Sequence, residues 1–207
     1  MENPNYRLET FSDGVFAIAL TLLIIEIKVP HAEIISTNKG LWSALFHTWP
    51  SWLAFIISFI TILISWVGHA HGFKLINKTT NKLVYANGLL LLSIIILPYF
   101  TRVLAEYIQT DTPKPAVTLY CAVSLMNSIS WNIITHITLY PESLYKSNVN
   151  LNKIKSTYKF VSYGLWFYSF AVLVSIWWPI PAFILVALSH TAWLVLGINL
   201  KEGKMLT

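Results

Sequence analysis

The chain is poor in charged residues, and this shortage narrows the class of protein. Charged side chains make up 11% of the 207 residues, whereas they make up about a quarter of an ordinary soluble domain. Hydrophobic residues account for 56% of the sequence, and the mean hydropathy is +0.61. A soluble protein of this length has no means of covering so much apolar surface, so we expect the lipid bilayer to act as its solvent.

Cysteine and the common hydrolase motifs are also scarce or missing. The single thiol, Cys121, excludes an intrachain disulfide and a Cys-x-x-Cys metal site. Neither H-E-x-x-H nor G-x-S-x-G occurs, so we predict no enzymatic activity, metal or cofactor. The basic residues that give the net charge of +5 stand in short loops, a pattern typical of membrane proteins that needs no nucleic-acid partner.

Six apolar runs are long enough to cross a bilayer as helices. They cover about 6–29, 49–69, 83–105, 116–139, 160–178 and 179–200. The last two runs share 41 uncharged residues, about 60 Å of helix, which Pro179 and Pro181 divide into a hairpin. The sequence therefore predicts an all-α integral membrane protein with one six-helix transmembrane domain over 1–207. The N-terminal segment is a poor signal peptide, so we expect the first helix to be retained.

The connections between these runs predict the orientation of the chain. Ten basic residues fall on the side that holds both termini and four fall on the other side, which places both termini in the cytoplasm. Leu41, Trp42 and Leu45 recur at helical spacing within 31–48, so a short amphipathic helix is expected on the outer surface. The polar and basic segment 140–159 is interpreted as a cytoplasmic connector.

The first predicted helix carries polar residues that a membrane span normally avoids. Arg7, Ser12 and Asp13 cluster near its start, and a charged residue inside a span costs about 2.5–3.5 kcal/mol on insertion scales. Such groups need partners or a function. Three hydrogen-bonding residues of the next two spans lie near the same depth, namely Trp66, His69 and Asn87. We predict an interhelical network that supports the first helix.

The pattern RxxxFSD, formed by Arg7, Phe11, Ser12 and Asp13, resembles the signature of the transmembrane-protein-175 family of potassium channels. The resemblance is strongest over 7–25 and extends in topology over the whole chain. It implies a homotetramer in which the first helix of each subunit lines a central pore. It also implies that tryptophan and histidine of the second helix bind the motif behind that pore helix, with no resident cofactor and potassium as the permeant ion.

Ile18, Leu22 and Ile25 form one stripe on the first helix. Their spacing alone fits a lipid-facing surface equally well. The resemblance implies that Ile18 forms the narrowest point and that Leu22 and Ile25 follow it. The filter sequence TVGYG is absent, so selectivity for potassium over sodium is expected to be moderate and to depend on pore diameter at Ile18 and on the hydroxyl of Thr21.

The sequence alone does not decide between alternative roles for three further residues. Glu26 would either concentrate cations at the outer mouth or pair with Lys28 or with a neighbouring helix. His136 and His190 would either titrate or stay neutral and hydrogen-bonded. The alternative functions are a proton-permeable channel and a secondary transporter. The expected location is a prokaryotic plasma membrane, with the lipid bilayer and further copies of the chain as partners.

Overall fold

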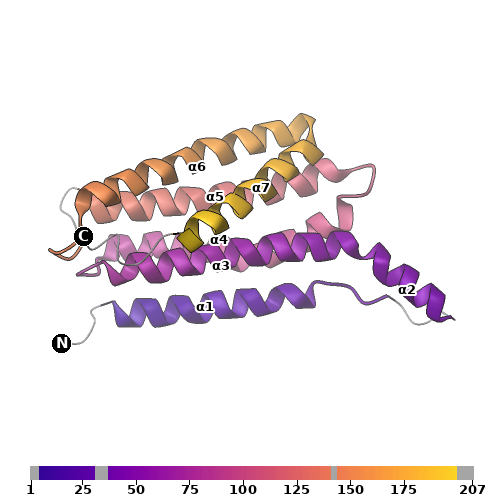
Figure 1. Cartoon of the computed structure of the whole chain (residues 1–207), viewed down its shortest axis with the longest axis horizontal. Helices are drawn as coiled ribbons and strands as arrows, with labels where there is room; N and C mark the ends of the chain where they lie inside the picture. The colour runs from indigo at the N-terminus through magenta and orange to yellow at the C-terminus, as the bar shows by residue number, and fades with distance from the viewer. Residues whose placement is uncertain (1–4, 31–36, 141–143, 200–207) are drawn as a thin grey trace.

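The structure, a computed structural model, describes residues 5–30, 37–140 and 144–199, which fold into a bundle of helices (Figure 1). The helices are α1 Tyr6–Ile25, α2 Asn38–His47, α3 Trp49–Lys74, α4 Asn81–Tyr107, α5 Pro113–Leu139, α6 Leu151–Trp177 and α7 Pro179–Asn199. All of them except α2 are long and apolar enough to cross a membrane, which gives six candidate spans. The predicted all-α class with six spans is confirmed.

Helix boundaries differ from the sequence expectation by four residues or more at three places. Helix α3 ends at Lys74 rather than at residue 69. The first helix ends at Ile25 rather than at residue 29, because its last turn tightens through bonds from Glu26 N to Leu23 O and from Ile27 N to Ile24 O. Helix α6 begins at Leu151 rather than at residue 160. The side chain of Asn150 caps it, so the second half of the expected connector is helical although its residues are polar and basic.

The short helix α2 matches the amphipathic helix expected within 31–48, while residues 31–36 lie outside the described part of the chain. Thr37 caps α2 by accepting a hydrogen bond from Gly40 N. The helix has no buried side chain and exposes Trp42 and Phe46. Figure 1 shows α2 beyond the far end of α1, at the end of the bundle where aromatic side chains would meet an interface.

The core is built around α4 and α5. Helix α4 packs against α1, α3 and α5, and α6 and α7 pack against α5. In Figure 1, α1 therefore lies on one side of the bundle and α6 on the opposite side. A buried polar contact joins the middle helices: Tyr120 and Thr101 both hydrogen-bond the Ser58 hydroxyl, at 3.0 and 2.7 Å. Helix α1 is thus a peripheral helix held against α3 and α4.

Candidate functional site

Helix α1 has one face packed against the bundle and one face that is exposed in the described part of the chain. Ser12, Phe16, Ala19 and Leu23 are buried against α3 and α4, three or four residues apart. The opposite face is exposed along the whole helix at alternating spacings of four and three, through Arg7, Phe11, Gly14, Ile18, Thr21 and Ile25. This heptad spacing is the one along which identical helices pack around a common axis. The face therefore has the pattern of an interhelical seam.

The residues predicted to line the pore are all exposed: Ile18, Thr21 and Ile25 lie on the seam, and Leu22 lies beside it. Ile18 is 61% exposed, Leu22 42% and Ile25 72%. Thr21 is exposed as well, and its hydroxyl donates to the Ile18 carbonyl at 2.8 Å. Because the proton is used within the helix, both lone pairs of the Thr21 oxygen remain available on the exposed face. An oxygen with free lone pairs can coordinate a cation.

The buried side of the N-terminal half of α1 is held by hydrogen bonds. Asn87 Nδ2 on α4 donates to Ser12 Oγ at 2.9 Å, and Ser12 Oγ donates to the Leu8 carbonyl at 2.8 Å. His69 Nε2 on α3 lies 2.9 Å from Asn87 Oδ1. Since an amide oxygen only accepts, the Nε2 atom must carry the proton. The direction of every bond from α3 through α4 to α1 is therefore determined.

A second contact in the same region joins α1 directly to α3. Trp66 Nε1 donates to Asp13 Oδ1 at 2.9 Å. This bond is exposed, whereas the bonds from His69 through Asn87 to Ser12 are buried. The structure thus brings together five of the seven residues predicted for the network: Ser12, Asp13, Trp66, His69 and Asn87. Arg7 and Phe11 make no hydrogen bond or ring contact within the described chain, and both are exposed on the seam.

The sequence analysis did not identify Asn5, whose hydrogen bonds hold the start of α1 against the rest of the bundle. Its side chain is buried and donates through Nδ2 to the Ile76 carbonyl at 2.9 Å, and Thr79 donates to its Oδ1. Asparagine before a helix is normally read as a cap, but this side chain makes no capping bond to α1. Its partners lie in the connector between α3 and α4, so only the tertiary structure identifies them.

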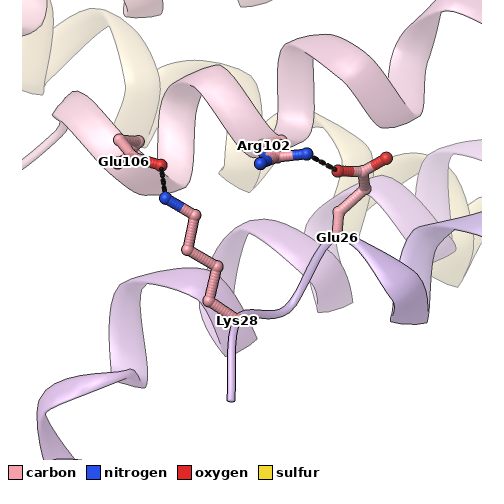
Figure 2. A network of polar contacts seen from close by, with 4 residues as sticks. All are labelled: Glu26, Lys28, Arg102 and Glu106. Atoms are coloured by element: carbon pink, nitrogen blue, oxygen red, sulfur yellow. Dashed lines mark hydrogen bonds and ion pairs between the residues drawn. The ribbon is translucent and has the colours of Figure 1, made fainter. Parts of the chain in front are cut away.

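The C-terminal end of α1 is joined to α4 by two ion pairs (Figure 2). Glu26 lies 3.3 Å from Arg102, and Lys28 lies 2.5 Å from Glu106. Of the three possibilities for Glu26, pairing with a neighbouring helix is the one observed, and Lys28 pairs elsewhere. Arg102 and Glu106 stand one turn apart near the C-terminal end of α4, a signal that the sequence offered and the prediction did not use.

The two histidines whose roles the sequence did not decide lie in different surroundings. His136 on α5 lies near two aromatic rings, those of Tyr140 and Tyr158, at centroid distances of 5.4 and 6.4 Å. His190 on α7 is buried and its ring stacks near Tyr168 at 5.7 Å. The Nδ1 atom of His190 has no hydrogen-bond partner among the described residues.

The chain is similar to proteins of one channel family. A family model described as the endosomal/lysosomal potassium channel TMEM175 matches residues 7–98. A potassium channel of Chamaesiphon minutus is 38% identical over 174 residues, which cover 83% of this chain and 85% of that protein. The endosomal/lysosomal proton channel TMEM175 of Gallus gallus is 33% identical over 129 residues, which cover 59% of this chain and 26% of that protein.

A solved structure agrees with these sequence likenesses. The crystal structure of a lysosomal potassium-selective channel TMEM175 homolog from Chamaesiphon minutus has a TM-score of 0.84 and 32% identity, and the match covers 95% of this chain and 99% of that one. Six candidate spans and this fold define a multi-pass membrane protein of an ion-channel class rather than an enzyme. The chain belongs to the TMEM175 family, so the resemblance carried by RxxxFSD is confirmed.

Proposed function

We propose that this protein is a potassium-permeable cation channel assembled from identical subunits, with the exposed face of α1 lining a central pore. The observation that carries the proposal is the heptad seam on α1, which is exposed from Arg7 to Ile25 on a helix long and apolar enough to span the bilayer and which includes the charged Arg7 and the polar Thr21. One helix encloses no pore, so several copies are needed. Four copies is the number that the family resemblance implies.

Aliphatic side chains on the seam support a hydrophobic gate. Rings of Ile18, Leu22 and Ile25 from neighbouring copies would narrow the pore over about two helical turns. A narrow apolar segment excludes water and so blocks ions without any charged barrier. Ile18 is the narrowest ring in this proposal, because it is the first bulky side chain on the seam after Gly14.

Selectivity would arise next to the gate. The Thr21 oxygen, with both lone pairs on the exposed face, would replace part of the hydration shell of a passing cation. Together with the pore diameter at Ile18, this would favour potassium over sodium moderately. The network of Ser12, Asn87 and His69 lies on the opposite side of α1, so its role would be to hold the pore helix rather than to contact ions.

The orientation and location follow from the charge pattern. Both termini would be cytoplasmic, and the membrane would be a prokaryotic plasma membrane. In this orientation the ion pair of Glu26 and Arg102 lies at the outer mouth. Because the pair is neutral overall, the positive charge of Arg102 would offset the attraction of the Glu26 carboxylate for cations.

The test is the reversal potential of the purified protein in planar bilayers with potassium on one side and sodium on the other. We expect a current that reverses toward the potassium equilibrium potential, and a larger current for Ile18→Ala. The matched control is Ile95→Ala, an isoleucine on α4 with a similar exposed fraction of 54%. Equal conductance for Ile18→Ala, Ile95→Ala and the unchanged protein would remove Ile18 from the pore.

Proton permeation is the second candidate, because animal relatives carry the name proton channel. A pH gradient imposed in symmetrical potassium separates the two ions: reversal that follows the pH gradient would favour protons, and reversal at zero would favour potassium. A secondary transporter would instead show saturable counter-flow of a solute and no ohmic current.

A further inference from the structure

A cleft of about 560 Å³ lies between α3, α5, α6 and α7. Its volume falls in the range of about 300–1,000 Å³ that is typical of ligand sites. The lining is mainly apolar, with Ile64, Ile134, Val161 and Leu194 among its residues, and none of them belongs to α1. An apolar lining between helices that span the bilayer suits the hydrocarbon chains of lipids.

One end of the cleft is formed by two connectors that are bonded to each other. Asn77 N donates to the Leu144 carbonyl at 2.8 Å, and Lys146 N donates to the Leu75 carbonyl at 2.9 Å. Leu75 and Tyr145, from the two connectors, both line the cleft. Figure 1 shows these connectors at the end of the bundle where α1 begins. The cleft therefore runs from the interior of the bundle to one membrane surface.

Three lysines stand at this end, each next in sequence to a residue that lines the cleft: Lys74, Lys146 and Lys153. The Lys146 ammonium donates to the Lys74 carbonyl at 2.7 Å, which holds it at the rim. The segments 74–82 and 140–159, which form this end of the bundle, hold seven lysines and one acidic residue, Glu142, which lies outside the described residues. The rim is therefore positively charged. Basic pockets between spans are typical sites for the headgroups of anionic lipids.

We propose that this cleft binds an anionic phospholipid, with one acyl chain between α3, α5, α6 and α7 and the phosphate at the lysines of the rim. Each part of the lipid meets the chemistry that suits it: the chain meets the apolar lining, and the phosphate meets Lys146 and Lys153. The lipid would come from the leaflet on the side of the chain where α1 begins. A lipid here would also fill the space between α3 and α6 and so stiffen the bundle behind the pore helix.

The test is the thermal midpoint of the purified, delipidated protein in detergent, with phosphatidylglycerol or phosphatidylcholine of the same acyl chains added. We expect phosphatidylglycerol to raise the midpoint by about 3 °C or more beyond phosphatidylcholine. Equal shifts for the two lipids would overturn the proposal, because the effect would then be general solvation of the apolar surface. Oleate alone distinguishes a phospholipid from a free fatty acid: an equal shift with oleate would overturn the phospholipid assignment.

Two variants examine the two ends of the lipid separately. Lys146→Gln with Lys153→Gln should abolish the extra shift, whereas Lys155→Gln with Lys159→Gln, which removes the same charge from exposed positions of α6 outside the lining, should retain it. Val161→Trp should fill the cleft and abolish binding of the chain. If the Val161 variant does not fold, the lysine pairs decide the outcome, and equal loss in both pairs would overturn the proposal.

A variant of His190 provides a third test, which distinguishes an acyl chain from a polar ligand in the cleft. It lines the cleft with an unpartnered Nδ1 atom, but an acyl chain accepts no hydrogen bond from it. His190→Leu should therefore leave the phosphatidylglycerol shift unchanged, and loss of the shift would indicate a polar ligand instead. The assay measures lipid binding and not ion flux, and its residues lie outside α1. A negative result would therefore leave the proposed channel function standing, and the absence of current would leave this site standing.

Discussion

The two ends of α1 are attached to the same neighbouring helix by different chemistry. At the N-terminal half, α4 contributes the neutral amide of Asn87, which bonds the buried Ser12 hydroxyl and connects it to His69. At the C-terminal end, α4 contributes Arg102 and Glu106, which form partly exposed ion pairs with Glu26 and Lys28 (Figure 2). The first attachment has fixed bond directions, and the second consists of flexible side chains.

This difference indicates which end can move. Buried hydrogen bonds in a low dielectric are costly to break, because the separated groups find no water. Exposed ion pairs contribute about 0–1 kcal/mol and are screened by salt. We therefore expect the N-terminal half of α1 to stay fixed on α3 and α4, and the C-terminal end to detach more readily. A pore helix that pivots at its N-terminal half would change the pore at Ile25 more than at Gly14.

The largest effect is expected for Asn87→Leu. The variant leaves His69 Nε2 without a partner in the interior and removes the donor to Ser12 Oγ, which keeps only its bond to the Leu8 carbonyl. This loss should lower the free energy of unfolding by about 1–2 kcal/mol. Thermal unfolding in detergent measures this loss. The matched control is Asn77→Leu, an exposed position that should shift the midpoint little. Equal midpoints for the two variants would mean that the buried bonds do not fix α1.

A smaller effect is expected for Trp66→Phe, which removes the indole donor to Asp13 and keeps an aromatic ring. We expect a loss of about 0.6 kcal/mol in the free energy of unfolding, typical of one hydrogen bond between spans. Potassium-over-sodium permeability should not change, because the contact supports the helix from behind. A stable Trp66→Phe channel with altered ion preference would place this contact in the permeation path.

The ion pairs should show a weaker and salt-dependent effect. Arg102→Gln should cost at most about 1 kcal/mol at low salt and less at high salt. The exchange Glu26→Arg with Arg102→Glu should restore the midpoint, and Asp111→Asn, an exposed acid near the same end, serves as the charge control. A loss that is independent of salt and is not restored by the exchange would show that packing, rather than charge, holds this end.

The smallest effect on protomer stability is expected for Arg7→Gln, within about 0.5 kcal/mol, because Arg7 is exposed and makes no hydrogen bond or ion pair in the described chain. If the seam joins copies of α1, the same variant should reduce the yield of assembled oligomer, measured by size-exclusion chromatography with light scattering. If neither the thermal midpoint nor the yield of oligomer changes, Arg7 stabilises neither the protomer nor the contact between copies.

Local sequence patterns were sufficient to predict several features of this protein. Hydropathy predicted the six spans, Pro179 and Pro181 predicted the hairpin between α6 and α7, and the RxxxFSD pattern indicated the family. Polar residues in an apolar span also identified most of the network, because such groups need partners inside a membrane. Trp66, His69 and Asn87 were predictable as partners of the first helix for this reason, although their individual bonds were not.

What the sequence determined by itself is therefore the number of spans, their approximate positions and the polar residues that need partners. These properties depend on composition within windows of about twenty residues. Only the tertiary structure decided that Glu26 binds Arg102, 76 residues away, that Asn5 binds the connector after α3, and that a cleft remains between α3 and α5–α7. Partner choice and unfilled space depend on how whole helices are arranged, and no local pattern encodes that arrangement.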